Sequence, residues 1–353
     1  NAYYSRNDKG VFFFHDTDKV LNTTIYSGAS AEVTDHECGH AILDAQRPGY
    51  FSSWSPDPGA FHESMGDIIA MCMATQDDRV LDKVMSECAG DLSKQNCLAA
   101  TGEQLGTTIQ HNYGEKATDG PWVRNAINNF TWSDTAKLPS SAPPDQLSRE
   151  PHSLSRLWTG ATYDILKGIV ADKVAHGEDS RTAIKEAGMD VLQMQGRLLD
   201  KGQAPKGSFK FKQMAQALVQ SENQLDGGKY TDLITQVMSD RKILAKNEFA
   251  EGTVPVGARE VSTVLGTSFG EFAGCSVSTV LSGAQVGFGQ SEADESELQA
   301  NMRDLIAAGE ILNTKPGQEI KTSDLFKANG EAYRGVVRWH DGQATIEPTY
   351  IAG

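Results

Sequence analysis

Two stretches in the first quarter of the chain carry apolar residues at helical spacing, residues 31–47 and 58–74. Pro48-Gly49 closes the first stretch and a proline opens the second, as is typical of helix ends. Before them, residues 2–4 and 11–14 are aromatic and apolar runs separated by a polar turn sequence that ends in glycine. This pattern predicts two strands followed by two helices.

The predicted secondary structure changes twice along the rest of the chain. Residues 76–151 are loop-rich, and helical periodicity then returns in four stretches, 153–171, 181–199, 209–222 and 230–244. After about residue 247 the chain is rich in Gly, Ser, Thr and Val, which predicts short strands in 251–289. A helix over 292–312 and a hairpin of 333–339 with 344–346 around Asp341-Gly342 are expected to follow.

These elements predict an α+β protein in three parts, residues 1–151, 152–246 and 247–353. The chain has 353 residues with 47 acidic against 32 basic side chains, a net charge of −15, which argues against a nucleic-acid partner. No apolar run approaches the roughly 20 residues of a transmembrane segment. The five cysteines cannot all pair within one chain, although Cys88 and Cys97 flank a short loop and are candidates for a disulfide.

The strongest chemical signal is the pentapeptide from His36 to His40, His-Glu-Cys-Gly-His. Residues four apart lie on one face of a helix, so both imidazoles can reach one metal ion. Glu37 is rotated by about 100° from His36 and faces the open side of that ion, where a base can deprotonate a metal-bound water. The motif predicts a catalytic metal site.

A second helix supplies the missing ligand. Glu63 and Asp67 are four residues apart just after Pro58-Gly59, in a segment whose following turns are strongly apolar. Glu63 would complete a site of two histidines and one carboxylate with a fourth position open, as catalytic zinc requires. Asp67 could accept the free N–H of a ligand imidazole and fix its orientation.

In the order and kind of these motifs, residues 1 to about 244 resemble the thermolysin-like zinc endopeptidases. Asn1-Ala2-Tyr3-Tyr4 is similar to that family's substrate-binding edge strand, and the segments 36–40 and 59–67 to its zinc helices, although His62 stands where an Asn is usual. The segment ending in Arg124 resembles the one that contacts the substrate carbonyl. His152, 28 residues further on, matches the histidine that stabilises the transition-state oxyanion.

The resemblance implies a fold with a β-rich N-terminal part, a zinc-binding catalytic subdomain and a helical subdomain that completes the cleft. It also implies one catalytic Zn²⁺, a peptide or protein substrate, and secretion. Tyr50 would be a second donor to the oxyanion, with Asn1, Ala2 and Arg124 holding the substrate backbone. Val33 and Val123 would line a pocket for an apolar residue after the scissile bond. The part after residue 246 has no counterpart, and its role stays open.

Some positions depart from the family pattern. Leu147 stands where the family has the acid that orients His152, and Asp145 or Glu150 could replace it; Glu150-Pro151-His152 is closer to the fungalysins. Calcium is possible but not assignable, with Glu32 and Asp77-Asp78 as the candidates.

Two other functions remain open from the sequence. A zinc aminopeptidase would use the same ligands, but the Gly-x-Met-Glu-Asn segment typical of that class is missing. A zinc-stabilised binding or adhesion module that has lost catalysis is the third reading, and the presence of Glu37 argues against it, because a structural site needs no base.

Overall fold

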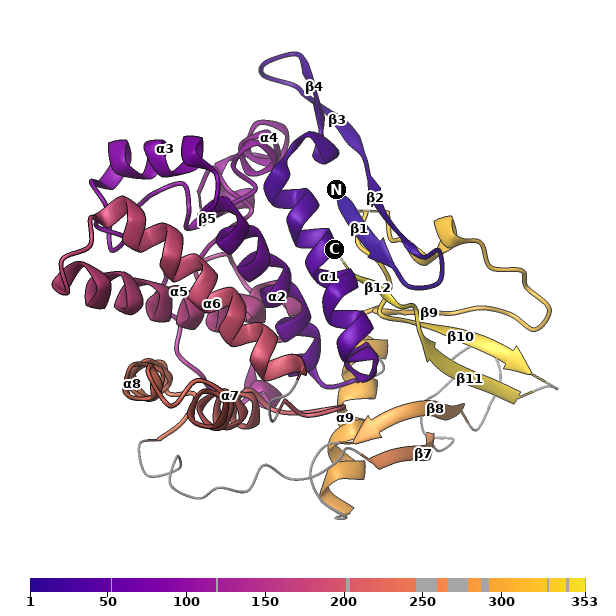
Figure 1. Ribbon diagram of the computed structural model, residues 1–353. Coiled ribbons are helices and arrows are strands. Elements are labelled where there is room, and N and C mark those ends of the chain that lie inside the picture. Colours follow the sequence, from indigo (N-terminus) through magenta and orange to yellow (C-terminus); the bar gives the residue numbers. More distant parts are fainter. Residues whose placement is uncertain are drawn as a thin grey trace.

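Helices make up about half of the structure, and most of the strands lie on the side of α1 that faces away from the other helices (Figure 1). The computed structural model describes residues 1–353 apart from 52, 119, 201–203, 246–258, 266–278, 287–291, 329, 341–342 and 353. About 52% of the chain is helical and 13% is in strands. This segregated mixture of helix and strand agrees with the α+β class expected from the sequence.

A small antiparallel sheet joins the two ends of the chain. Its strands lie in the order β12 (Ile351–Ala352), β1 (Ala2–Ser5) and β2 (Gly10–Phe13). The two predicted N-terminal strands are confirmed, whereas the third strand comes from the far end of the chain. Both termini therefore lie close together beside the first helix (Figure 1). A separate hairpin follows, β3 (His15–Asp18) with β4 (Thr23–Tyr26).

The two helices predicted from the first quarter of the chain are α1 (Ala31–Gln46) and α2 (Pro56–Ala74). Ser30 caps α1 by accepting the N–H of Val33, and prolines occupy the first turn of α2, where the backbone N–H groups need no helical partner. The helices touch at two glycines: a Cβ on Gly39 would lie 2.9 Å from the Cα of Gly66. This close approach brings the side chains of both helices onto one site.

Four helices from the middle of the chain pack against α2 or against one another. They are α5 (Pro151–Ala175), α6 (Ser180–Asp200), α7 (Phe211–Leu225) and α8 (Thr231–Asp240), which confirms the four predicted helical stretches with shifted ends. The large aromatic side chains of Phe61, Trp158, Phe209 and Phe211 are fully buried and pack against one another. The main hydrophobic core therefore lies between α2 and these later helices.

The segment expected to be loop-rich contains two helices, α3 (Asp78–Cys88) and α4 (Glu103–Tyr113), and the short strand pair β5 (Ala100–Thr101) and β6 (Arg124–Asn125). The prediction was wrong for α3 because its apolar stripe is narrow. Leu81, Val84 and Cys88 are buried at helical spacing, Val80 and Met85 are partly buried beside them, and the remaining side chains are polar. The suggested Cys88–Cys97 disulfide is also absent, since both thiols are free and that of Cys88 donates to the carbonyl oxygen of Val84.

The described part of the last third forms a five-stranded mixed sheet with a helix, α9 (Glu292–Ala307). The strand order is β7 (Arg259–Leu265), β8 (Thr279–Val286), β11 (Gln343–Pro348), β10 (Gly335–His340) and β9 (Ile311–Leu312). The predicted hairpin is confirmed as the antiparallel pair β10 and β11, although its turn at 341–342 lies outside the described residues. No described helix is long and apolar enough to cross a bilayer.

A second, smaller core ties this region to the rest of the molecule. Met302 of α9 and Val337 and Ile346 of the sheet pack around Trp54, which comes from the loop between α1 and α2 and is 2% exposed. The C-terminal region is thus held to the first part of the chain by a buried indole from the loop between α1 and α2 as well as by the strand pairing of β12 with β1.

The contact between α1 and α2 makes a testable prediction. Gly39→Ala places a methyl group against the backbone of α2, which cannot move aside, and should lower the free energy of unfolding by about 1–3 kcal/mol. Gly196→Ala is the matched control: Gly196 lies on the exposed side of α6 with nothing within 4 Å, so alanine should be neutral or stabilise by up to about 1 kcal/mol. Urea unfolding midpoints measure both, and equal effects of the two variants would contradict the glycine contact.

Candidate metal centre

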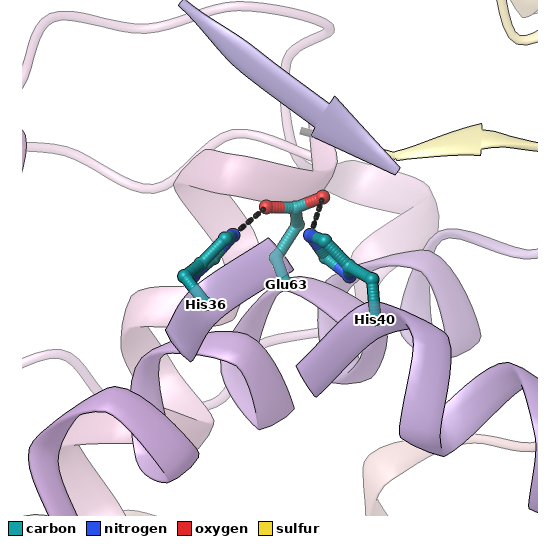
Figure 2. Close-up of side chains that lie close together, drawn as sticks. All are labelled: His36, His40 and Glu63. Atoms are coloured by element: carbon teal, nitrogen blue, oxygen red, sulfur yellow. Dashed lines mark ion pairs between the residues drawn. The ribbon is translucent and has the colours of Figure 1, made fainter. Parts of the chain in front are cut away.

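Three side chains from two helices converge on one buried point (Figure 2). His36 and His40 come from successive turns of α1, and Glu63 reaches them from α2. The Nε2 atom of His36 lies 3.4 Å from Oε2 of Glu63, and Nε2 of His40 lies 3.6 Å from Oε1. One ligand atom from each residue lies within 4.8 Å of the others, and this is the only such group among the described residues.

The donor set and its hydrogen bonding fit a divalent cation. The three residues are at most 5% exposed, yet Nε2 of His40 and Oε2 of Glu63 have no hydrogen-bond partner among the described residues. A buried polar atom without a partner is costly, and a cation between these atoms would satisfy them together. Two imidazoles and one carboxylate with room for a further ligand are the donor set typical of catalytic zinc.

The second nitrogen of each ligand imidazole is held by a neighbour. Nδ1 of His36 lies 2.9 Å from Oδ1 of Asp67, and Nδ1 of His40 lies 2.7 Å from Nδ1 of His62. These contacts fix the ring orientations and leave each Nε2 directed at the shared point. From the sequence, His62 was recognised only as a departure from the family pattern. Its position next to Glu63 on α2 was the one signal that it could lie at the site.

Glu37 lies on the same helix as the ligand histidines and is almost fully buried. Its Oε2 has no hydrogen-bond partner among the described residues. Burial raises the pKa of Glu37 to about 7, against the opposing effect of the nearby His36 charge. A carboxyl group with such a pKa can take up and release a proton near neutral pH, which is what a general base requires.

His152 lies on the other side of the carboxylate ligand, at the start of α5. Its Nε2 is 3.4 Å from Oε2 of Glu63, and its Nδ1 is 2.6 Å from Oε1 of Glu150. The Glu150 carboxylate also accepts the backbone N–H groups of His152 and Ser153, so it caps α5 and orients the imidazole at once. Of the two acids considered for this role, the structure places Glu150 in contact with His152.

The charge of His152 follows from its two acidic neighbours. Burial by itself lowers the pKa of His152, but the carboxylates of Glu63 and Glu150 outweigh it and raise the pKa to about 10 in the metal-free chain. A protonated imidazole at this position is a donor to any negative charge that forms beside the ligands.

Arg124 forms a bidentate ion pair with Asp67, with Nε 2.8 Å from Oδ2 and Nη2 2.8 Å from Oδ1. Burial by itself raises the pKa of Asp67, but Arg124 and His36 outweigh it and hold the pKa at about 2. Arg124 therefore supports the ligand histidine through Asp67. It also lines a cavity shared with Asn1 and Ala2, whose side toward the site is formed by His36, Glu37 and His152.

The expectation for Tyr50 is corrected by its position. Its side chain is 1% exposed, and its hydroxyl donates to the carbonyl oxygen of Pro205 at 2.7 Å. The only proton of that hydroxyl is therefore used to tie the loop after α1 to the helical part. Sequence reasoning could not anticipate this partner, which lies 155 residues away.

The calcium candidates also have other partners. Glu32 accepts the backbone N–H of Gly102, Asp77 caps α3 and pairs with Arg79, and Asp78 pairs with Arg181. None of these acids belongs to a group of three close ligands in the described part of the chain. No family model, curated protein or solved structure matches the chain, so its function is inferred from the site itself.

The support of His36 by Asp67 can be measured directly. Asp67→Asn keeps the size of the side chain but removes the charge that holds the imidazole, and should weaken Zn²⁺ binding by roughly 10–100-fold. Asp172→Asn, at the exposed end of α5, is the control and should leave affinity unchanged. Competition with a chromophoric chelator gives the affinities. An unchanged affinity in a folded Asp67→Asn protein would show that Asp67 does not tune the site.

Proposed function

We propose that the chain is a zinc-dependent endopeptidase whose zinc ion is bound by His36, His40 and Glu63. The observation that carries the proposal is the convergence of these three buried side chains with Glu37 next to them, whose Oε2 has no hydrogen-bond partner among the described residues. A purely structural zinc site closes its fourth position with protein and has no use for a buried base. The order of motifs resembling thermolysin-like peptidases supports the same function, and by that resemblance the protein acts outside the cytoplasm.

Each of these side chains has a separate role in the proposed peptide hydrolysis. A zinc ion held by the three ligands would polarise the peptide carbonyl and lower the pKa of water. Glu37 takes the proton from the attacking water and later passes it to the leaving amine, which its pKa near 7 permits. His152, held by Glu150, donates its Nε2–H to the oxygen that becomes negative as the carbonyl carbon turns tetrahedral.

Residues of the neighbouring cavity would position the peptide. Asn1 and Ala2, where β1 begins, line this cavity together with Val33, Val123 and Arg124. A peptide could pair with the backbone at Asn1 and Ala2 as an added strand, with its next side chain against the two valines. The proposed preference is therefore for an apolar residue directly after the scissile bond.

One observation favours a second candidate, a zinc aminopeptidase. β12 already pairs with Tyr4 and Ser5 on the edge of β1 that faces away from β2. A peptide that adds to this edge has only Asn1 to Tyr3 for pairing, so the cleft is short on one side. Acetylating the N-terminus of a short substrate separates the two activities, because only an aminopeptidase needs the free amine.

The role of Glu37 is tested by Glu37→Gln. This change removes the base while keeping the shape, and should lower kcat for casein or peptide cleavage by about 10²–10⁴-fold. Zinc should remain bound at one ion per chain, which metal analysis of the purified protein checks. Glu115→Gln, on an exposed turn, is the control and should keep full activity. A zinc-loaded wild-type protein that cleaves nothing would support a binding module instead.

The pocket lined by Val33 and Val123 predicts the cleavage pattern. A random peptide library should be cut mainly on the amino side of Leu, Ile, Val or Phe, because the isopropyl groups of Val33 and Val123 offer no partner for a charge. Mass spectrometry of the products reads the position directly. Dominance of Asp, Glu, Lys or Arg after the cut bond would contradict this specificity.

A further inference from the structure

A second cavity lies on the other side of the metal centre and reaches into the C-terminal region. It encloses about 150 Å³, enough for several waters or the head of a side chain. Its lining includes Glu63 and His152 of the metal site together with Arg334, Tyr350 and Ile351 of the C-terminal region. The part of the chain that the sequence left without a role therefore lines the approach to the ligands.

Arg334 stands at the start of β10 with its backbone held on both sides. Its N–H donates to the carbonyl oxygen of Glu310 at 2.9 Å, and its carbonyl oxygen accepts the N–H of Thr349 at 3.2 Å. Nη2 of its guanidinium lies 3.5 Å from the position a Cβ on Gly59 would take. Gly59 precedes Glu63 by four residues, one turn of α2 or about 6 Å along the axis, so the guanidinium lies close to the metal ligand.

The guanidinium of Arg334 has no hydrogen-bond or ion-pair partner among the described residues, although it is only partly exposed. Its nearest acidic neighbours are engaged elsewhere. Glu310 pairs with Lys327 at 2.7 Å, and Glu150 is used by His152 and the first turn of α5. Arginine keeps its charge and offers five N–H donors in a planar fork, so an anion is the natural partner.

Other arginines of comparable burial behave differently. Four of them hold a carboxylate of the chain itself: Arg6 with Asp44, Arg124 with Asp67, Arg149 with Asp304 and Arg241 with Asp164. Arg156 and Arg47 donate instead to backbone carbonyl oxygens, those of Pro144 and Gln146 for Arg156 and that of Gln46 for Arg47. An arginine that serves only the fold would be expected to have such a partner. Arg334 instead directs an unpaired charge into a cavity that opens on the metal site.

We propose that Arg334 binds a carboxylate of the peptide substrate and makes this cavity a subsite for acidic groups. The proposal rests on the peptidase function proposed above and adds to it the chemistry of a second specificity site. The carboxylate is either an acidic side chain near the cut bond or the carboxyl end of the chain. Both would form the bidentate pair that a guanidinium offers.

The test compares substrates that differ by one charge. Quenched fluorescent hexapeptides carry one Glu or one Gln at each position in turn, and each peptide is made with a free or an amidated carboxyl end. For wild type, one Glu position or the free carboxyl end should raise kcat/KM roughly tenfold or more over its neutral counterpart, mainly through a lower KM. Arg334→Gln should abolish this ratio, and Arg334→Lys should retain part of it, because lysine keeps the charge without the fork.

Arg338→Gln is the matched control, since Arg338 lies four residues further along, within β10, and pairs with Glu347 at the surface. It should leave the preference and the activity on neutral peptides unchanged. Arg334→Gln should keep its melting temperature, because the guanidinium makes no bond within the described fold. Absence of any carboxylate preference in wild type, or its persistence in Arg334→Gln, overturns the proposal.

A binding measurement separates this inference from the proposed function. Zinc-loaded Glu37→Gln protein is titrated calorimetrically with the same hexapeptides, and the ratio of Kd values for the charged and neutral forms is compared with that of Glu37→Gln/Arg334→Gln. An Arg334-dependent ratio without cleavage by wild type supports the anion subsite while refuting the peptidase. Cleavage with no such ratio supports the peptidase and refutes the subsite.

Discussion

The structure depends on the contact between two helix backbones at Gly39 and Gly66. A Cβ on Gly66 would lie 2.5 Å from Nδ1 of His36, so any larger residue there would displace a ligand imidazole. Only this close approach lets imidazoles from α1 and a carboxylate from α2 share a point while the helices stay packed. The same packing buries the ligands, which strengthens every electrostatic interaction among them.

Burial at this site is tolerable because each imidazole has a fixed partner on its far side. Asp67 holds His36, His62 holds His40, and Glu150 holds His152, so the second ring nitrogens are satisfied within the protein. The Nε2 atoms are left to face the centre, and with Glu37 they form a group that a divalent cation would complete. The polar side chains around the ligands therefore set the direction of each donor before any metal or substrate arrives.

The C-terminal third is part of the site's surroundings rather than a separate appendage. β12 extends the sheet that begins at Asn1, Trp54 is buried in the core of the last sheet and helix, and Arg334 reaches toward the turn of α2 before Glu63. On this arrangement the region that has no counterpart in the thermolysin-like pattern limits the cleft on one side. Through Arg334, the same region also places a positive charge beside the cleft.

The sequence by itself determined the elements that depend on near neighbours. Helical spacing and the prolines at helix ends located α1 and α2, and the four-residue interval placed His36 and His40 on one face. Apolar and aromatic runs next to turn sequences located β1 and the β10–β11 hairpin. Only the tertiary structure decided which distant groups meet: Tyr50 with Pro205, Arg124 with Asp67, and β12 with β1. The physical reason is that periodicity is set by rotation per residue along the chain. Partners far apart in sequence are chosen by packing and charge in the folded molecule, and no local pattern records that choice.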